Sequence, residues 1–202
     1  MSPSLAALRR EAVDCRRCDL WKLGTQTVFG EGWRRGVMFV GEQPGDVEDR
    51  EGKPFVGPAG RLLRELLEEV GIADEDVYVT NAVKHFKWRP AGKRRLHDKP
   101  SWTEIQACEH WLAGELAAVK PALVVCLGAT AAQALLGKSA RVGQLRGSLH
   151  ELESGVPAVV TIHPSAVLRA ETSAGSGEPS SSRTSRSPAM PPSYGAGSTE
   201  SS

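Results

Sequence analysis

The sequence predicts an α/β protein in which helices cover both faces of a small, mainly parallel four-stranded sheet, a three-layer α/β/α sandwich. Four short apolar runs supply the strands, and runs that are apolar throughout are typical of parallel strands buried on both faces. Helical patterns lie between the runs, and this alternation indicates a doubly wound sheet. The predicted strands are residues 37–41, 77–80, 123–127 and 158–162.

Three helical patterns separate these strands, at residues 58–70, 103–119 and 128–136. The first carries a stripe of leucines, begins at a proline and is followed by Gly71, as many helices are. The second begins with Thr103 and Gln106 at the spacing of a capping box. The third is rich in alanine and follows a strand directly, which predicts a tight strand-to-helix turn.

The chain divides into two parts by composition. Residues 171–202 include 11 serines, 4 prolines and 4 glycines, and they contain no Leu, Ile, Val or Phe. Such a segment cannot bury enough apolar surface to offset the entropy of ordering it. We therefore expect one domain over residues 1–170 and a disordered tail over residues 171–202.

The charges are balanced in number but not in position. The 202 residues hold 25 Lys and Arg against 24 Asp and Glu, a net charge of +1, which by itself argues against nucleic acid as a partner. Residues 84–99, however, contain seven Lys and Arg and one acid, with two histidines and two aromatic residues among them. This pattern fits a solvated surface loop and a contact surface for phosphates and unstacked bases equally well.

No segment has the features of an export signal or a membrane span. The first 13 residues contain charged side chains and lack an apolar core. The longest uncharged stretch, 121–137, is short for a span and is interrupted by polar residues. The sequence therefore predicts a cytoplasmic protein.

Four cysteines, Cys15, Cys18, Cys108 and Cys126, indicate a metal centre. Disulfides are rare inside cells, and the CxxC pair does not follow a strand as a redox motif would. Cys108 and Cys126 each lie in an apolar pattern, so either could instead be a core residue. Together the four could bind zinc or an iron–sulfur cluster, and the spacing leaves the choice open.

Ligands of doubly wound sheets bind beyond the carboxyl ends of the strands. Two glycine patterns, 30–36 and 128–137, have the wrong spacing or position for a nucleotide loop, so we expect no nucleotide cofactor. The polar sequences that follow the strands are GEQPG at 41–45, then KPFVG at 53–57, Asn81, and HPS at 163–165.

These motifs resemble the uracil-DNA glycosylase superfamily, and the cysteines resemble its iron–sulfur branch. Gln43 and the KRRLH sequence at 93–97 resemble the UdgX class, whose loop usually reads KRRIH. The resemblance covers about residues 5–170. One departure is that the family continues past HPS into a closing helix, whereas here Ala170 runs into the serine-rich tail.

The resemblance implies an enzyme that flips uracil out of DNA into a pocket. Phe55 would stack on the base, Asn81 would read its Watson–Crick edge, and His163 would donate a proton to the O2 atom of the departing uracil. The uracil-binding residues implied are Gly41, Gln43, Asp46, Phe55 and Asn81. The implied DNA contacts are Lys84, Lys93, Arg94, Arg95, Ser165, Leu168 and Arg169, although Lys93, Arg94 and Arg95 could equally anchor the loop.

For the UdgX class the resemblance implies that His97 captures the sugar C1′ atom after uracil leaves, in a single turnover, with Glu42 as its proton acceptor or orienting group. His97, Glu42 and His163 are then the catalytic residues. One alternative is an ordinary glycosylase that turns over, with Glu42 or Asp46 activating water. Another is a protein that binds nucleic acid without catalysis.

The resemblance also implies the cofactor and the partner. The four cysteines would hold a 4Fe-4S cluster, with zinc as the alternative. The partner would be uracil-containing DNA, single- or double-stranded, bound by a monomer.

Overall fold

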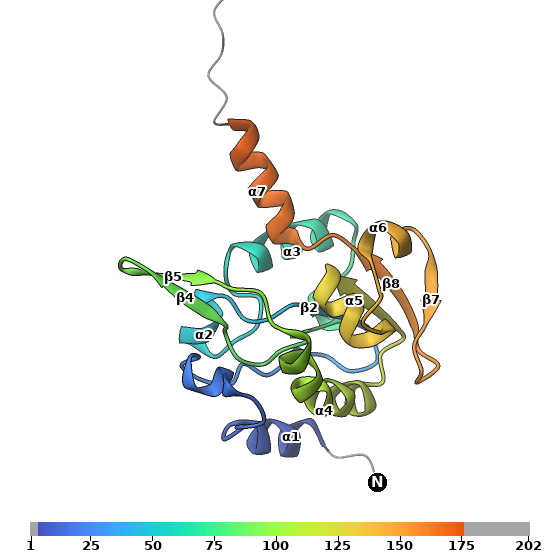
Figure 1. Ribbon diagram of the computed structural model, residues 1–202. Helices are drawn as coiled ribbons and strands as arrows, with labels where there is room; N and C mark the ends of the chain where they lie inside the picture. Colours follow the sequence, from blue (N-terminus) through green and yellow to red (C-terminus); the bar gives the residue numbers. More distant parts are fainter. Residues whose placement is uncertain (1–3, 176–202) are drawn as a thin grey trace, which may run out of the picture.

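Six strands form the central sheet of the computed structural model, which describes residues 4–175 (Figure 1). Their order across the sheet is β1-β3-β2-β6-β8-β7. The four central strands are parallel, namely β2 (Val37–Gly41), β3 (Val77–Asn81), β6 (Leu123–Leu127) and β8 (Pro157–Thr161). The edge strands β1 (Glu31–Gly32) and β7 (Leu149–Glu151) are antiparallel to their neighbours.

The predicted fold class is confirmed, but the sheet has six strands and not four. The two additional strands were missed because they are only two and three residues long and carry no apolar run. Both lie at the edges of the sheet, where they leave the central parallel order unchanged.

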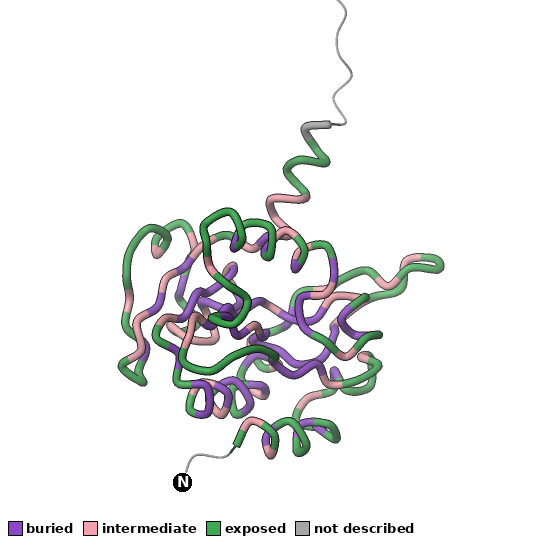
Figure 2. Tube along the Cα trace, turned by 180° about the vertical axis from the view of Figure 1, so that it is seen from behind, coloured by how far each residue is buried: buried purple, intermediate pink, exposed green. Residues whose placement is uncertain are grey.

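Helices cover both faces of the sheet. One face packs on α3, and the other on α4 and α5. The central strands are buried and the outer surfaces of the helices are exposed (Figure 2). The helices are α1 (Leu5–Ala12), α2 (Asp46–Glu51), α3 (Pro58–Glu69), α4 (Trp102–Val119), α5 (Ala129–Leu136), α6 (Val142–Leu145) and α7 (Pro164–Gly175), with short 3-10 turns η1 (Asp19–Lys22) and η2 (Asp74–Asp76). No helix among residues 4–175 combines the length and the apolar character that crossing a membrane requires.

Helix α4 begins slightly earlier than the sequence predicted. Its cap is Ser101, whose hydroxyl accepts from the Glu104 amide at 3.3 Å while the Glu104 carboxylate accepts from the Ser101 amide at 2.6 Å. This reciprocal pair is a capping box, but the predicted one used Thr103 and Gln106. The prediction was wrong in register because both pairs have the same three-residue spacing.

The basic segment contains a two-stranded hairpin. Strands β4 (Trp88–Ala91) and β5 (Arg94–His97) pair in antiparallel orientation as a separate small sheet, and the hairpin projects from the body in Figure 1. Trp88 pairs with His97, so His97 lies at the base of the hairpin and not at its tip.

The last helix crosses the predicted domain boundary. Helix α7 continues through residues 171–175, which the sequence assigned to the disordered tail, and it contacts α3 before leaving the body (Figure 1). Thr172 and Ser173 are accommodated because their hydroxyls donate to backbone carbonyls one turn earlier, at 2.9 Å each. A helix therefore does follow the HPS motif. The rest of the predicted tail, residues 176–202, lies outside the described part of the chain.

Candidate active site at the strand ends

Three predicted uracil-binding residues meet at the carboxyl ends of β2 and β3. Gly41 and Asn81 are paired in the parallel register. A Cβ atom on Gly41 would lie 2.4 Å from Asn81 Oδ1 and 2.8 Å from the Phe55 ring, closer than such atoms approach. Glycine is therefore required for Phe55 and Asn81 to reach this point, and the three residues form one cluster.

Both the backbone conformation of Phe55 and the packing of its ring fix its position. Its φ angle is 55°, in the left-handed region that bulky residues rarely adopt. The following loop is fixed because the Gly57 amide donates to Glu48 Oε1 at 2.8 Å. Strain of this kind persists only where the surrounding structure imposes it, and it is often found at binding sites.

His163 lies beside Phe55, with ring centroids 6.4 Å apart and an angle of 27° between the planes. Its Nδ1 atom accepts from the Ser165 amide at 3.1 Å. A neutral ring must then carry its proton on Nε2. Burial lowers the pKa of His163 to about 4, so the ring is neutral near pH 7 and offers one N–H donor.

Glu42 contacts two side chains, the expected partner His97 and a partner that the sequence did not indicate, Thr130. Its Oε1 atom is 3.2 Å from His97 Nε2, and its Oε2 atom accepts from the Thr130 hydroxyl. Burial opposes ionisation, but the hydrogen bonds from His97 and Thr130 outweigh it and lower the pKa of Glu42. Glu42 is therefore a carboxylate with one oxygen fixed and the other directed at His97.

Gln43 and Asp46 bind the hairpin. The Gln43 amide donates to the carbonyls of Lys87 and Asp98, at 3.0 and 3.1 Å, and its oxygen accepts from the Lys87 amide at 3.2 Å. Asp46 accepts from the Arg95 guanidinium at 2.5 Å. The resemblance implied that both side chains bind uracil and that Gln43 also helps to hold the loop; in the structure both hold the segment that carries His97.

Arg95 anchors the hairpin to α2 through two carboxylates. Its guanidinium reaches Asp46 and, at 2.7 Å, the fully buried carboxylate of Asp49. Its carbon Cζ lies 5.4 Å from the Phe86 ring centroid, within cation–π range. Lys93 and Arg94 are exposed next to it and are free to meet a phosphate backbone. Of the three basic residues of the loop, one is therefore an anchor and two are exposed.

Lys84 was predicted to bind DNA, and this prediction is wrong. Its side chain is fully buried, and its ammonium donates to Glu115 at 2.5 Å and to the Thr80 hydroxyl and Asn81 carbonyl at 2.7 Å each. The sequence could not separate this lysine from the exposed basic run that follows it. The buried ion pair of Lys84 and Glu115 therefore contacts the backbone of Asn81.

The remaining predicted DNA contacts lie around helix α7. The amide and hydroxyl of Ser165 both lie within hydrogen-bond distance of His163 Nδ1. The Arg169 guanidinium donates to the Ser165 hydroxyl at 3.3 Å. Leu168 is half-buried and Arg169 is exposed. These residues follow the same strand end as His163, at the start of α7.

The four cysteines do not come together. The Cys108 thiol donates to Cys18 and lowers the pKa of Cys18 to about 7, so this pair is in contact. Cys15, which follows α1, accepts through its sulfur from Nε1 of Trp111, one turn beyond Cys108 on α4, at 3.1 Å. Cys126 is fully buried within β6, packed in the core on the α4 side of the sheet. The prediction that Cys126 is a metal ligand is therefore corrected.

Among residues 4–175, no three His, Cys, Asp or Glu side chains are arranged to hold a single metal ion. A cluster differs from an ion because each ligand binds a different iron, so its ligands surround a larger space. Cys15, Cys18 and Cys108 fit such a group in donor chemistry, and Cys18 and Cys108 are in contact. Cys126 does not.

Sequence reasoning missed two residues. Thr130 lies just beyond the end of β6, but a threonine there has no distinctive pattern. His85 was assigned no role, and yet burial lowers its pKa and its exposed fraction is 3%. Neither residue could be identified before its partners were known.

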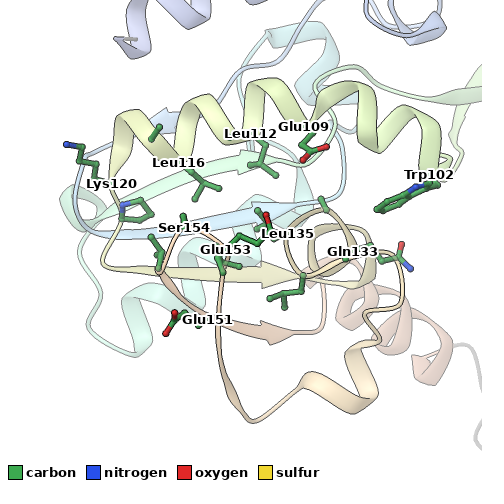
Figure 3. A pocket seen from close by; sticks show the side chains of 18 residues that line it. Trp102, Glu109, Leu112, Leu116, Lys120, Gln133, Leu135, Glu151, Glu153 and Ser154 are labelled. Carbon is green, nitrogen blue, oxygen red and sulfur yellow. The ribbon is translucent and has the colours of Figure 1, made fainter. Parts of the chain in front are cut away.

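A cavity of about 910 Å³ lies away from this edge, between α4, α5 and the turn before β8 (Figure 3). Mostly apolar side chains such as Leu112, Leu116 and Leu135 line it. None of the predicted catalytic, uracil-binding or DNA-binding residues does, so it is separate from the candidate active site.

Comparison with known proteins identifies a family and several relatives. A family model described as the uracil DNA glycosylase superfamily matches residues 29–182. A protein from Archaeoglobus fulgidus named Type-4 uracil-DNA glycosylase is 39% identical over 173 residues, which cover 82% of this chain and 83% of that protein. Proteins of the same name from Thermotoga maritima and Pyrobaculum aerophilum are 41% identical over 157 residues and 38% identical over 173 residues. These two matches cover 77% and 82% of this chain and 78% and 85% of those proteins.

Proposed function

The chain belongs to the uracil DNA glycosylase superfamily, and on this premise we propose that it excises uracil from DNA. The observation that carries the proposal is the convergence of Phe55, Asn81 and His163 at one edge of the sheet. A flat ring, an amide and an N–H donor are the groups that a pocket for a flipped uracil needs.

Phe55 and Asn81 select the base. The Phe55 ring stacks on the uracil face, and the Asn81 amide donates to a uracil carbonyl and accepts from its N3–H group. Cytosine presents the opposite donor and acceptor pattern at this edge, so it would leave two buried polar groups unpaired. The close approach at Gly41 leaves no room for a side chain between them.

His163 and Glu42 assist cleavage of the bond between N1 and C1′. The electron pair of that bond leaves with uracil, and the Nε2–H group of His163 donates to O2 as negative charge develops there. The Glu42 carboxylate stabilises the cationic sugar that remains. Both groups are already in the required state, because the ring is neutral and the carboxylate is ionised.

After uracil leaves, either water or His97 can react with the sugar C1′ atom. The relatives support reaction with water, and therefore repeated turnover, best. Each of the three relatives is named as a glycosylase, which denotes an enzyme that releases the base. In this reading Glu42 takes a proton from water as the water oxygen bonds to C1′. Asp46 is less suited to this role, since its carboxylate is paired with Arg95 and Arg50.

A second candidate, covalent capture by His97, is favoured by one observation. His97 Nε2 lies 3.2 Å from the Glu42 oxygen that Thr130 leaves free, and the hairpin that carries it is anchored through Gln43 and Arg95. Nε2 would bond to C1′ while its proton passes to Glu42, and the C–N bond formed would resist hydrolysis. This is the UdgX behaviour that the sequence motifs imply.

An iron–sulfur cluster is proposed to join the N-terminal segment to α4. Cys15 and Cys18 follow α1, and Cys108 lies on α4, so a bound cluster would cross-link these elements and supply folding free energy.

The test uses a uracil-containing oligonucleotide, single-stranded and as a duplex, at known ratios to the full-length protein. Free uracil and an SDS-resistant, heat-stable protein–DNA band are measured together. Many uracils released per protein without a band would establish turnover; one uracil per protein with a band would establish capture. Uracil left intact after prolonged incubation would overturn the glycosylase proposal and favour the non-catalytic alternative.

Replacing Thr130 with valine is expected to slow the step that depends on Glu42 by roughly tenfold to a hundredfold. The variant keeps the side-chain shape but removes a hydrogen bond to a charged group, worth about 1.5–3 kcal/mol. Single-turnover rates of uracil loss across pH measure the effect, and the Glu42-dependent limb of the profile should move to higher pH. Thr172→Ala, on the exposed part of α7, is the control and should behave as wild type.

A further inference from the structure

Helix α4 carries apolar residues on three sides, and the part of the chain that the structure describes covers two of them. One side packs on the sheet, and a second packs against Leu8 of α1. The third side presents the half-buried Leu116 together with the exposed Ala113 and Ala117. A helix that is apolar all round is normally covered all round. This third side therefore has room for a further partner.

The third side of α4 forms one wall of the 910 Å³ cavity in Figure 3. Leu135 and Leu136 of α5, both half-buried, line it as well. The lining residues run along α4 from Trp102 to Lys120, and a helix of 18 residues is roughly 27 Å long at about 1.5 Å per residue. The cavity is thus a long groove, named here the α4–α5 groove, and its length suits the apolar face of another helix.

Acidic side chains dominate the charge of the α4–α5 groove. Glu109, Glu151 and Glu153 line it and are exposed, against one cation, Lys120. Among residues 4–175 none of these three carboxylates forms an ion pair. Charges beside an apolar centre select a partner of the opposite sign. A complementary partner therefore carries apolar side chains with Lys or Arg beside them.

The same charges exclude three other occupants. Phosphates of DNA would meet carboxylates and be repelled. A second copy docked through the same groove would set glutamate against glutamate, because a two-fold interface uses the same surface on both subunits. Residues 176–202 of this chain contain no Leu, Ile, Val or Phe that could enter the groove. A separate protein is the occupant that the observations favour.

We propose that the α4–α5 groove docks an amphipathic helix of a partner protein, with an apolar face flanked by lysine or arginine. Recognition of a helix in a groove uses apolar anchors at positions i, i+3 or i+4, and i+7. The groove is not lined by Phe55, Asn81 or His163, so the partner and DNA bind at the same time. The inference goes beyond the glycosylase proposal and does not depend on it.

The experiment begins with a displayed library of helical peptides that is randomised on one face. It is selected on the full-length wild type and counter-selected on Ala117→Arg. Ala117 is exposed, so an arginine there fills the groove without removing core packing. Enriched peptides are expected to combine apolar anchors at helical spacing with an excess of Lys and Arg. Failure to enrich any peptide, or enrichment of acidic peptides, would overturn the proposal.

The most enriched peptide is then labelled, and its Kd for each full-length variant is measured by fluorescence anisotropy. Leu116→Asp and Ala117→Arg are expected to raise Kd at least about tenfold. Glu151→Lys combined with Glu153→Lys should weaken the basic peptide and strengthen its charge-reversed counterpart, most clearly at low salt. Leu66→Asp is the matched control and should bind as wild type, because this 44% exposed leucine lies on α3, on the other face of the sheet.

Equal Kd values for Ala117→Arg and wild type would overturn the proposal, even if Leu116→Asp fails to fold. Displacement of the peptide by uracil-free DNA would assign the groove to DNA instead. A wild-type dimer in sedimentation that Ala117→Arg dissociates would assign it to a second copy. Uracil release by Ala117→Arg should equal that of wild type, so failure of the docking proposal and failure of the glycosylase proposal are observed separately.

Discussion

If wild type forms the SDS-resistant protein–DNA band that capture requires, replacing His97 with alanine is expected to abolish the band completely while uracil release continues. The ring is half-exposed and directed at Glu42, so its loss opens space for water beside C1′ without disturbing Phe55, Asn81 or His163. A protein that stops after one uracil should then release several per molecule. The gel band and the number of uracils released per protein measure the two effects on the same samples.

Two controls make this result specific. Arg94→Ala removes an exposed positive charge from the same hairpin strand and should weaken DNA binding without changing the chemistry. Glu42→Gln keeps the hydrogen-bonding shape but removes the proton acceptor, so it should slow capture. If wild type gives no band and releases many uracils, capture is wrong. His97→Ala should then leave turnover almost unchanged.

The residues that the sequence could place are those fixed by strand ends. A parallel sheet brings the carboxyl ends of its strands to one edge, so Gly41, Asn81 and His163 were expected to meet from their positions alone. Phe55 lies between strands and was placed by resemblance. The structure explains its position by the clash that any side chain at Gly41 would cause.

The sequence could not predict the contacts of residues whose role depends on the direction of the side chain. Lys84 and Arg95 belong to one basic run, yet the first faces Glu115 in the core and the second faces Asp46 and Asp49. Cys126 completes a count of four cysteines but packs in a different cluster of core side chains from Cys18 and Cys108. Composition and spacing carry no information on this, because these partners lie far apart in the sequence.

Replacing Lys84 with methionine is expected to lower the free energy of unfolding by about 3–5 kcal/mol. Methionine fills most of the same volume, but Glu115 would remain as a buried charge without its cation, retaining only neutral donors such as Tyr78, at 3.0 Å. Chemical denaturation of the full chain measures the loss. Lys93→Met, an exposed position on the hairpin, should change the free energy by no more than about 0.5 kcal/mol.

The double variant Lys84→Met with Glu115→Leu distinguishes an unpaired charge from lost packing. If the charge is the cause, removing it should recover most of the stability, since apolar replacements of buried ion pairs are often neutral. A double variant less stable than Lys84→Met would contradict this account. Because the ammonium also donates to the Asn81 carbonyl, a stable double variant should still excise uracil more slowly than wild type. Recovered stability without recovered activity would assign the buried pair a role in positioning Asn81.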